Sequence, residues 1–130
     1  MKLLVVFAAL AVPAVAHHSW VAEFDESKPV EVTGVVTRIA WENPHVWFYA
    51  DVKDANGKVT SWGFGGGAPG QLMRRGITKS LLQPGMIIHV EGYRSRDGSN
   101  SASSSKVTFP DGRQACLDLL LRCQAAARGR

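Results

Sequence analysis

Hydrophobic and polar residues alternate through the middle of the chain, and this pattern predicts a series of short β-strands. Residues 45–52 alternate most clearly, with apolar residues on one face and polar or aromatic residues on the other. Residues 30–41 are rich in β-branched residues, and their apolar positions change phase at Gly34, which predicts a bulge or bend there. Asn56-Gly57 is a strong hairpin signal, so residues 59–64 are expected to return as a third strand.

The second half of the chain predicts one short helix and further strands. A glycine-rich stretch, residues 63–70, breaks the sheet and precedes a helix over residues 71–75, which Gly76 ends. Three more elements are expected, a fourth strand, a mobile polar loop and a last strand pair or broken strand, at residues 86–94, 99–105, and 106–109 with 113–115.

This order of elements predicts an all-β fold with one short helix. A long first strand interrupted by a glycine fits a five-stranded Greek-key barrel of the OB type, and a small antiparallel sandwich is the alternative. The pattern contains no crossover helices, which excludes a parallel α/β fold.

The N-terminus predicts export. Residues 1–16 have the features of a secretory signal peptide, with Lys2 as the basic residue and Ala14-Val15-Ala16 as the cleavage site. The apolar run is shorter than the roughly 20 residues that span a bilayer. We therefore expect a periplasmic or secreted protein that has no membrane segment after cleavage. Its predicted parts are a single barrel domain at residues 17–115 and a variable C-terminal tail at residues 116–130.

Charge changes this picture little. The chain has 15 basic and 11 acidic residues, and without Lys2 the 14 against 11 leave a net charge of about +3. Because Lys and Arg are scattered, no nucleic-acid partner is expected.

The two cysteines, Cys116 and Cys123, lie close together near the C-terminus. Export makes a disulfide chemically possible. Residues seven apart in a helix are about 10.5 Å apart along the axis, which is too far for a disulfide, so the bond would require a non-helical tail. We interpret the cysteines as incidental thiols.

Cleavage after Ala16 would make His17 the first residue of the mature protein. Its amine and imidazole could together chelate a metal, most plausibly copper, with His18 or His45 completing the site. The alternative for His17 and His18 is a frayed polar terminus. His45 follows Asn43-Pro44, which is also ordinary turn chemistry.

Four aromatic residues lie on the strands that form the ligand face of an OB barrel: Trp47, Tyr49, Trp62 and Phe64. Aromatic rings on this face can stack on planar ligands, sugars or bases. The alternative, which we favour, is that they fill the core or lie under the N-terminal arm, where Phe24 needs burial partners.

The glycine-rich stretch formally matches G-x-G-x-x-G, but the short helix after it excludes a dinucleotide-binding unit. A weaker hypothesis is that backbone amides at the helix start, with Arg74 or Arg75, hold a carboxylate or phosphate. No arrangement of nucleophile, base and acid stands out, so no catalytic residue is assigned and a non-catalytic protein is expected.

Several short motifs resemble one family, and they occur in the family's order. They are His17-His18-Ser19, Asn43-Pro44-His45, Arg74-Arg75-Gly76 and Glu91-Gly92-Tyr93. This is a family of small exported bacterial proteins of unknown function (domain of unknown function 6152). The resemblance covers roughly residues 16–113 and implies an exported single domain, without an established activity.

The sequence thus predicts an exported binding or accessory protein that captures copper at its mature N-terminus. The alternative is an OB-type module whose aromatic face holds a small molecule or a periplasmic partner protein.

The copper hypothesis predicts that the mature protein binds one Cu(II) per chain and binds it more tightly than Zn(II). One Gly inserted before His17 should weaken copper binding, because it separates the amine from the ring while all imidazoles remain. His89→Ala is the control and should have little effect. Calorimetry on the processed protein measures both, and equal copper affinity with and without the extra Gly would contradict an N-terminal site.

Overall fold

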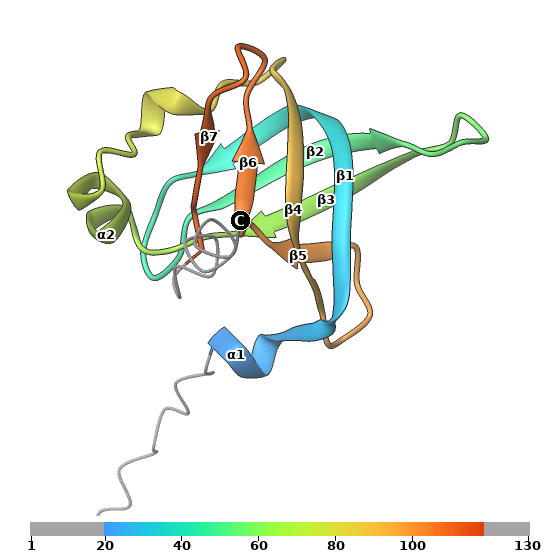
Figure 1. Cartoon of the computed structure of the whole chain (residues 1–130), viewed down its shortest axis with the longest axis horizontal. Helices are drawn as coiled ribbons and strands as arrows, with labels where there is room; N and C mark the ends of the chain where they lie inside the picture. Colours follow the sequence, from blue (N-terminus) through green and yellow to red (C-terminus); the bar gives the residue numbers. More distant parts are fainter. Residues whose placement is uncertain (1–19, 119–130) are drawn as a thin grey trace, which may run out of the picture.

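A computed structural model of the chain describes residues 20–118, and their main feature is a strongly curved β-sheet (Figure 1). The strands, in chain order, are β1 (Phe24–Ala40), β2 (Trp47–Lys53), β3 (Val59–Gly65), β4 (Ile87–Ser95), β5 (Ser101–Ser103), β6 (Lys106–Thr108) and β7 (Gln114–Ala115). The helical elements are α1 (Trp20–Glu23), α2 (Pro69–Arg74) and the 3-10 turn η1 (Lys79–Leu81). No helix in the described part of the chain is long and apolar enough to cross a membrane.

Five strands close into a barrel in the order β1-β2-β3-β5-β4, because β1 also pairs with β4. The first half of β1 pairs with β4, from Pro29 opposite Tyr93 to Val35 opposite Ile87. Its second half pairs with β2. All contacts are antiparallel except β3 with β5. This strand order, with the short helix between β3 and β4, confirms the predicted OB-type barrel and excludes the sandwich.

The bulge in β1 lies three residues beyond its predicted position. The register with β2 shifts between Val36 and Arg38, so Thr37 is the extra residue. Val35 is 42% exposed and Val36 is 1% exposed, so the phase before Gly34 continues past it. The prediction of a bulge at Gly34 is therefore wrong. Gly34 instead allows a close approach, because a Cβ there would lie 2.7 Å from the carbonyl oxygen of Asp51 in β2.

The fifth barrel strand is formed by residues that were expected to be a mobile loop. β5 pairs in parallel with β3, from Gly63 opposite Ser101 to Gly65 opposite Ser103. Ser103 and Ser104 are fully buried. Ser103 accepts a hydrogen bond from the Tyr93 amide at 3.0 Å, and the Ser104 hydroxyl donates to the Gly65 carbonyl at 2.8 Å. These side-chain hydrogen bonds hold a polar segment in the barrel.

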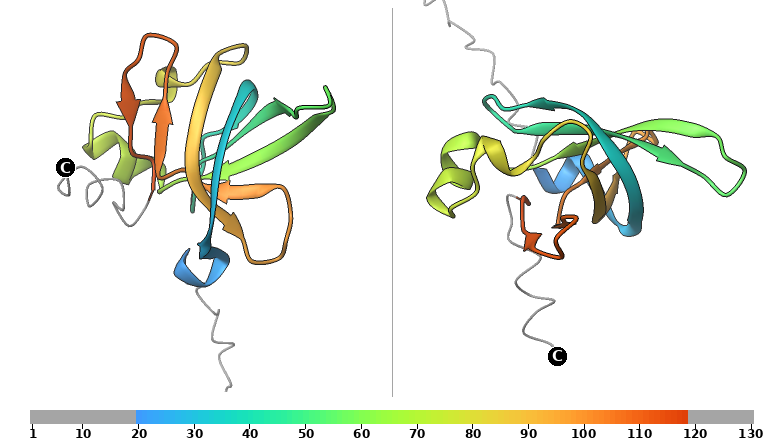
Figure 2. Two further views of the ribbon diagram at one scale, coloured as in Figure 1. Left: turned by 45° about the vertical axis from the view of Figure 1, so that its right-hand side comes forward. Right: turned by 90° about the horizontal axis from the view of Figure 1, so that it is seen from above.

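The predicted last strand pair exists, but it lies outside the five-stranded barrel. β6 pairs with β4, from His89 opposite Thr108 to Glu91 opposite Lys106, and β7 pairs with β6. Figure 2 shows this hairpin beside β4, away from the tip of the β2–β3 hairpin. Its buried residues, Val107 and Phe109, extend the core at this side.

The core continues past Ala115, into the segment that the sequence analysis assigns to a variable tail. Leu117 is fully buried, and its carbonyl accepts a hydrogen bond from the Gly67 amide at 2.7 Å. Cys116 is disulfide-bonded, so the interpretation of the cysteines as incidental thiols is wrong. Cys123, the other cysteine of the sequence, lies outside the described residues. The helical spacing used against a disulfide does not apply at Cys116, because β7 ends at the residue before it.

Helix α2 covers one end of the barrel, opposite the tip of the β2–β3 hairpin (Figures 1 and 2). Gly76 has φ +79° and follows the helix as predicted. Its amide donates to Met73 O at 3.0 Å, and the Ile77 amide donates to Leu72 O at 2.9 Å, which is a Schellman motif. Leu72 and Ile77 both lie in the core. The helix end and the hydrophobic packing therefore reinforce each other.

The core fills the inside of the barrel and is built from the inward face of each strand. The rings of Phe48 and Phe64 stack with centroids 5.2 Å apart, and Leu72 from α2 is fully buried. The other members of this core cluster are Val36, Val46, Ala50, Ile77, Leu82, Ile88, Val90, Ala102, Val107, Phe109 and Leu117.

The crossing of β4 and β5 predicts that Gly92 tolerates no side chain. A Cβ at Gly92 would lie 1.7 Å from the backbone carbonyl oxygen of Ser103, so one strand would have to move. We expect Gly92→Ala to lower the free energy of unfolding by about 3 kcal/mol or more. Chemical denaturation with a barrel-sensitive signal measures this.

Gly70→Ala is the matched control, because Gly70 lies in α2 and a Cβ there would only make an ordinary 3.5 Å contact with Arg74. It should be neutral or stabilising by up to about 1 kcal/mol. Equal denaturation midpoints for Gly92→Ala and Gly70→Ala would show that the β4–β5 crossing has room for a side chain.

Candidate functional site

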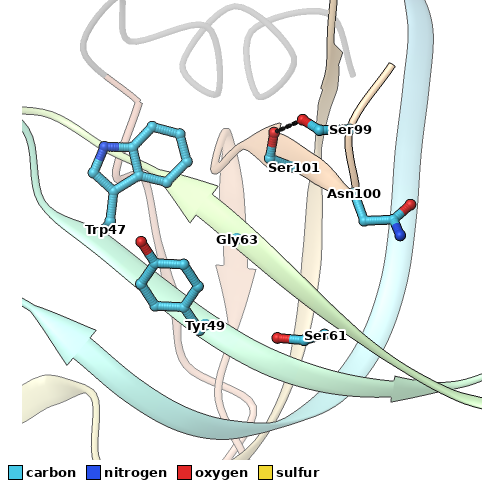
Figure 3. A pocket seen from close by; sticks show the side chains of 7 residues that line it. All are labelled: Trp47, Tyr49, Ser61, Gly63, Ser99, Asn100 and Ser101. Carbon is cyan, nitrogen blue, oxygen red and sulfur yellow. Dashed lines mark hydrogen bonds between the residues drawn. The ribbon is translucent and has the colours of Figure 1, made fainter. Parts of the chain in front are cut away.

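A groove lies on the outer face of β2 and β3, beside the loop that joins β4 to β5. Its volume is about 390 Å³. Seven residues line it: Trp47, Tyr49, Ser61, Gly63, Ser99, Asn100 and Ser101. In Figure 3 the two aromatic side chains lie on one side, Ser99 and Ser101 lie on the other, and Gly63 is between them. All seven residues are uncharged. Across the groove, the aromatic rings face the hydroxyl groups of Ser99 and Ser101.

The strand register brings these residues together. Arg38 is opposite Tyr49, Tyr49 is opposite Gly63, and Gly63 is opposite Ser101, so one row of outward positions crosses β1, β2, β3 and β5. The bulge at Thr37 is what places Arg38 in this row, because it shifts the register by one residue. The Arg38 guanidinium lies 4.1 Å from the centre of the Tyr49 ring and covers it.

Gly63 forms the floor of the groove. A Cβ at Gly63 would lie 3.2 Å from Cε1 of Tyr49 and 3.8 Å from Cε3 of Trp47, so both rings extend over this glycine. The next outward residue of β3 is Gly65, opposite Trp47. The aromatic side chains of β2 therefore lie over a part of β3 that has no side chains.

The serine wall of the groove is held by the loop before β5. Arg94 donates to the carbonyls of Gly98 at 3.0 Å and Ser99 at 3.2 Å, and to Oδ1 of Asn100 at 3.2 Å. The amide of Ser99 donates to Oδ1 of Asp97 at 2.9 Å, and the hydroxyls of Ser99 and Ser101 are 2.7 Å apart. The loop, which the sequence predicts to be mobile, is therefore held by hydrogen bonds from Arg94 of β4 and between its own residues.

The four aromatic residues predicted to share one face are divided between two. Trp47 and Tyr49 point outward and line the groove. Phe64 is fully buried in the core, and Trp62 packs against the core and against Phe64, with ring centroids 6.2 Å apart. The N-terminal arm reaches the outward pair, because the buried Phe24 ring lies 6.5 Å from Trp47.

The turn between β2 and β3 explains this division. The amide of Asp54 donates to the Lys58 carbonyl, which leaves three residues in the loop, and Gly57 has φ +81°. A two-residue turn on Asn56-Gly57 would pair Tyr49 with Phe64 and put all four rings on one face. The third loop residue shifts the register by one, and such a shift turns every side chain of β3 to the other face.

Of the residues of the copper hypothesis, only His45 lies within the described part of the chain. His17 and His18 lie outside the described residues, so the N-terminal site stays a prediction. His45 lies between β1 and β2 and is half-buried, next to the cis peptide bond Asn43-Pro44. No group of three histidine, cysteine or acidic residues within residues 20–118 could hold a metal. His89 is engaged elsewhere, with Glu31 at 2.9 Å and Thr33 at 2.8 Å.

Arg74 and Arg75 lie at the end of α2 and do not line the groove. Two backbone amides of the glycine-rich stretch, both before the first residue of α2, already have partners. The Gly66 amide donates to the Val46 carbonyl, and the Ala68 amide donates to the Gln71 side chain. Arg75 donates to the Asp118 carbonyl at 3.1 Å. Residues 65–67 are thus a buried, hydrogen-bonded part of the fold, and the anion hypothesis for the amides at the helix start stays a prediction.

Five residues that line the groove are not predicted as site residues from the sequence: Ser61, Gly63, Ser99, Asn100 and Ser101. For Gly63 the sequence does contain a signal, because Gly63 and Gly65 occupy alternate positions at the end of β3. Glycine in a strand often marks a place where another group approaches closely. The serines gave no such signal, because a serine-rich segment after Asp97-Gly98 has the composition of a loop.

Comparison with known proteins identifies the family. Residues 5–104 match the family described as "Family of unknown function (DUF6152)". This match spans more than half of the 130 residues, and the chain belongs to this family, which confirms the resemblance seen in its motifs. No curated protein matches the chain.

Two solved structures are similar to the chain. One is the crystal structure of the ZRD-deleted mutant of TiaS in complex with agmatine, with 22% identity over 65% of this chain and a TM-score of 0.47. This chain spans 22% of that protein's length. The other is Rim1, a mitochondrial single-stranded DNA binding protein of S. cerevisiae, with 11% identity over 68% of this chain and 96% of that chain and a TM-score of 0.47.

The loop geometry predicts a shifted titration of Asp97. A hydrogen bond from the Ser99 hydroxyl, then one from the Ser99 amide, lowers the pKa of the Asp97 carboxyl below its ordinary value. The lowered pKa means that the loop contact stabilises the fold above about pH 4 and is lost as the pH falls through the folded-state pKa. Ser99→Ala should raise the pKa of Asp97 in an NMR titration. Asp111, whose pKa is lowered by Arg113, is the internal control and should not change.

Proposed function

We propose that this member of the DUF6152 family is a non-catalytic binding module that holds a small ring-bearing molecule in the groove over β2 and β3. The position of Trp47 and Tyr49 is the main support for this proposal. They lie on the outward face of a closed OB-type barrel, over Gly63 and across from the serine loop. This face, with the loop between β4 and β5, is where OB barrels bind oligonucleotides and oligosaccharides.

The groove has the composition of a recognition site. Its volume of about 390 Å³ lies within the range typical of small-molecule sites, about 300–1,000 Å³. One wall is aromatic and supplies apolar contact area, and the other presents hydroxyl groups that can fix orientation. The groups that line it are rings, hydroxyls, an amide and a glycine, which suit binding rather than proton or group transfer.

The walls are held before any ligand arrives. Arg38 covers Tyr49, Phe24 lies against Trp47, and Arg94 fixes the loop through three acceptors. Preorganised walls reduce the entropy that binding would otherwise cost. Export, as predicted from residues 1–16, is part of this proposal, and it would place the groove outside the cytoplasm.

The proposal predicts that ring-bearing fragments bind at this groove and depend on Trp47. A panel of indole, adenosine and methyl glucoside, added to the isotope-labelled mature protein, should shift the amide signals of Gly63 and Ser101 with at least one member. Trp47→Ala should abolish these shifts, because stacking on one ring is worth about 1–3 kcal/mol. Ile87→Ala is the control, since Ile87 is 60% exposed and does not line the groove. Shifts confined to other regions, or no shifts with any member, would contradict the proposal.

A further inference from the structure

We infer that the ligand of this groove is a neutral saccharide, an inference that rests on the proposed binding function. The stacking surface is supplied by Trp47. One face of Tyr49 is already covered by the Arg38 guanidinium, 4.1 Å from the ring centre. Trp47 has the Phe24 ring 6.5 Å away, is half-buried, and lines the groove with its exposed part. A sugar ring has an apolar face that can pack on such an aromatic side chain, while its hydroxyl groups remain at the edge.

The opposite wall matches the edge of a sugar ring. Ser99 and Ser101 on this wall, and Ser61 on β3, present hydroxyl groups, and each hydroxyl can both donate and accept a hydrogen bond. The Ser99 and Ser101 hydroxyls are 2.7 Å apart and already form a pair. Neighbouring hydroxyl groups of a saccharide have the same two capacities, so they can extend this pair. A purely apolar ring would cover these hydroxyl groups and leave their remaining hydrogen-bonding capacity unsatisfied, which costs free energy.

Charge separates a saccharide from a nucleic acid. Strong binding of nucleic acid draws on Lys or Arg side chains that neutralise phosphates. The seven lining residues carry no charge, and the two arginines beside them have other partners. Arg94 donates to three acceptors of the loop, and Arg38 is stacked on Tyr49. The residues that line the groove therefore offer a ring surface and hydroxyl groups, and none of them carries a charge that would neutralise a phosphate.

The test compares neutral oligosaccharides with single-stranded DNA on the mature protein. The probes are cello-oligosaccharides, chito-oligosaccharides and an oligothymidylate, titrated while the signals of Gly63 and Ser101 are followed by NMR. We expect at least one saccharide to bind with an affinity that hardly changes between about 50 mM and about 200 mM salt, because no phosphate is neutralised. The oligothymidylate should bind at least about tenfold more weakly than that saccharide.

Variants test the aromatic ring and a groove hydroxyl group separately. Trp47→Ala should weaken saccharide binding at least about tenfold, and Trp47→Phe, which keeps a ring and is the safer variant for folding, should recover part of it. Ser61→Ala should weaken binding by about two- to tenfold. Ser80→Ala is the matched control, because Ser80 is an exposed serine of η1 that does not line the groove.

The outcomes distinguish this inference from the proposed function. Trp47-dependent binding of the oligothymidylate or of adenosine, without saccharide binding, would overturn the saccharide and leave the binding module standing. Failure of every probe to shift the groove signals would overturn both. Saccharide binding that is equally strong in Trp47→Ala and Ser61→Ala would move the site elsewhere and also overturn the inference.

Discussion

The close crossing of β4 and β5 is the constraint on which the rest of the structure depends. A Cβ at Gly92 would lie 1.7 Å from the Ser103 carbonyl oxygen, so the two backbones meet where one residue has no side chain. This crossing lets β5 reach β3 and close the barrel. It also places the preceding loop over β3, where the Gly63 amide donates to the Asn100 carbonyl at 3.0 Å. The groove therefore depends on Gly92 and Ser103, because their backbones could not approach this closely if Gly92 carried a side chain.

Two single-residue shifts in register then decide which side chains reach the groove. The bulge at Thr37 turns Arg38 outward onto Tyr49 and lets Ile39 face the core opposite Phe48. The three-residue turn between β2 and β3 brings glycine, rather than an aromatic residue, opposite Tyr49. Because side chains alternate with a period of two, each shift exchanges the faces of a strand. The core and the groove are therefore opposite faces of the same strands, and the same two register shifts determine which residues each face receives.

Periodicity alone predicts much of this fold and little of its site. Residues 45–52 alternate without interruption, and the hairpin and the helix end are marked by Asn56-Gly57 and Gly76, so these elements are predicted correctly. β5 could not be predicted, because its stability comes from serine hydroxyl and amide contacts to distant backbone groups. The division of the aromatic residues could not be predicted either, since Asn-Gly occurs in turns of more than one length.

The serine-rich segment shows why composition misleads here. Within residues 99–105, Ser103 and Ser104 are fully buried against glycine-containing strands, whereas Ser99 and Ser101 line the groove. A hydroxyl group suits both positions for one reason, since it is small and can donate and accept hydrogen bonds. In the barrel it pairs with the backbone groups of Tyr93 and Gly65, and in the groove it faces the aromatic rings. One short polar segment thus closes the fold and provides the polar wall of the candidate site, so a change that loosens the first should also disturb the second.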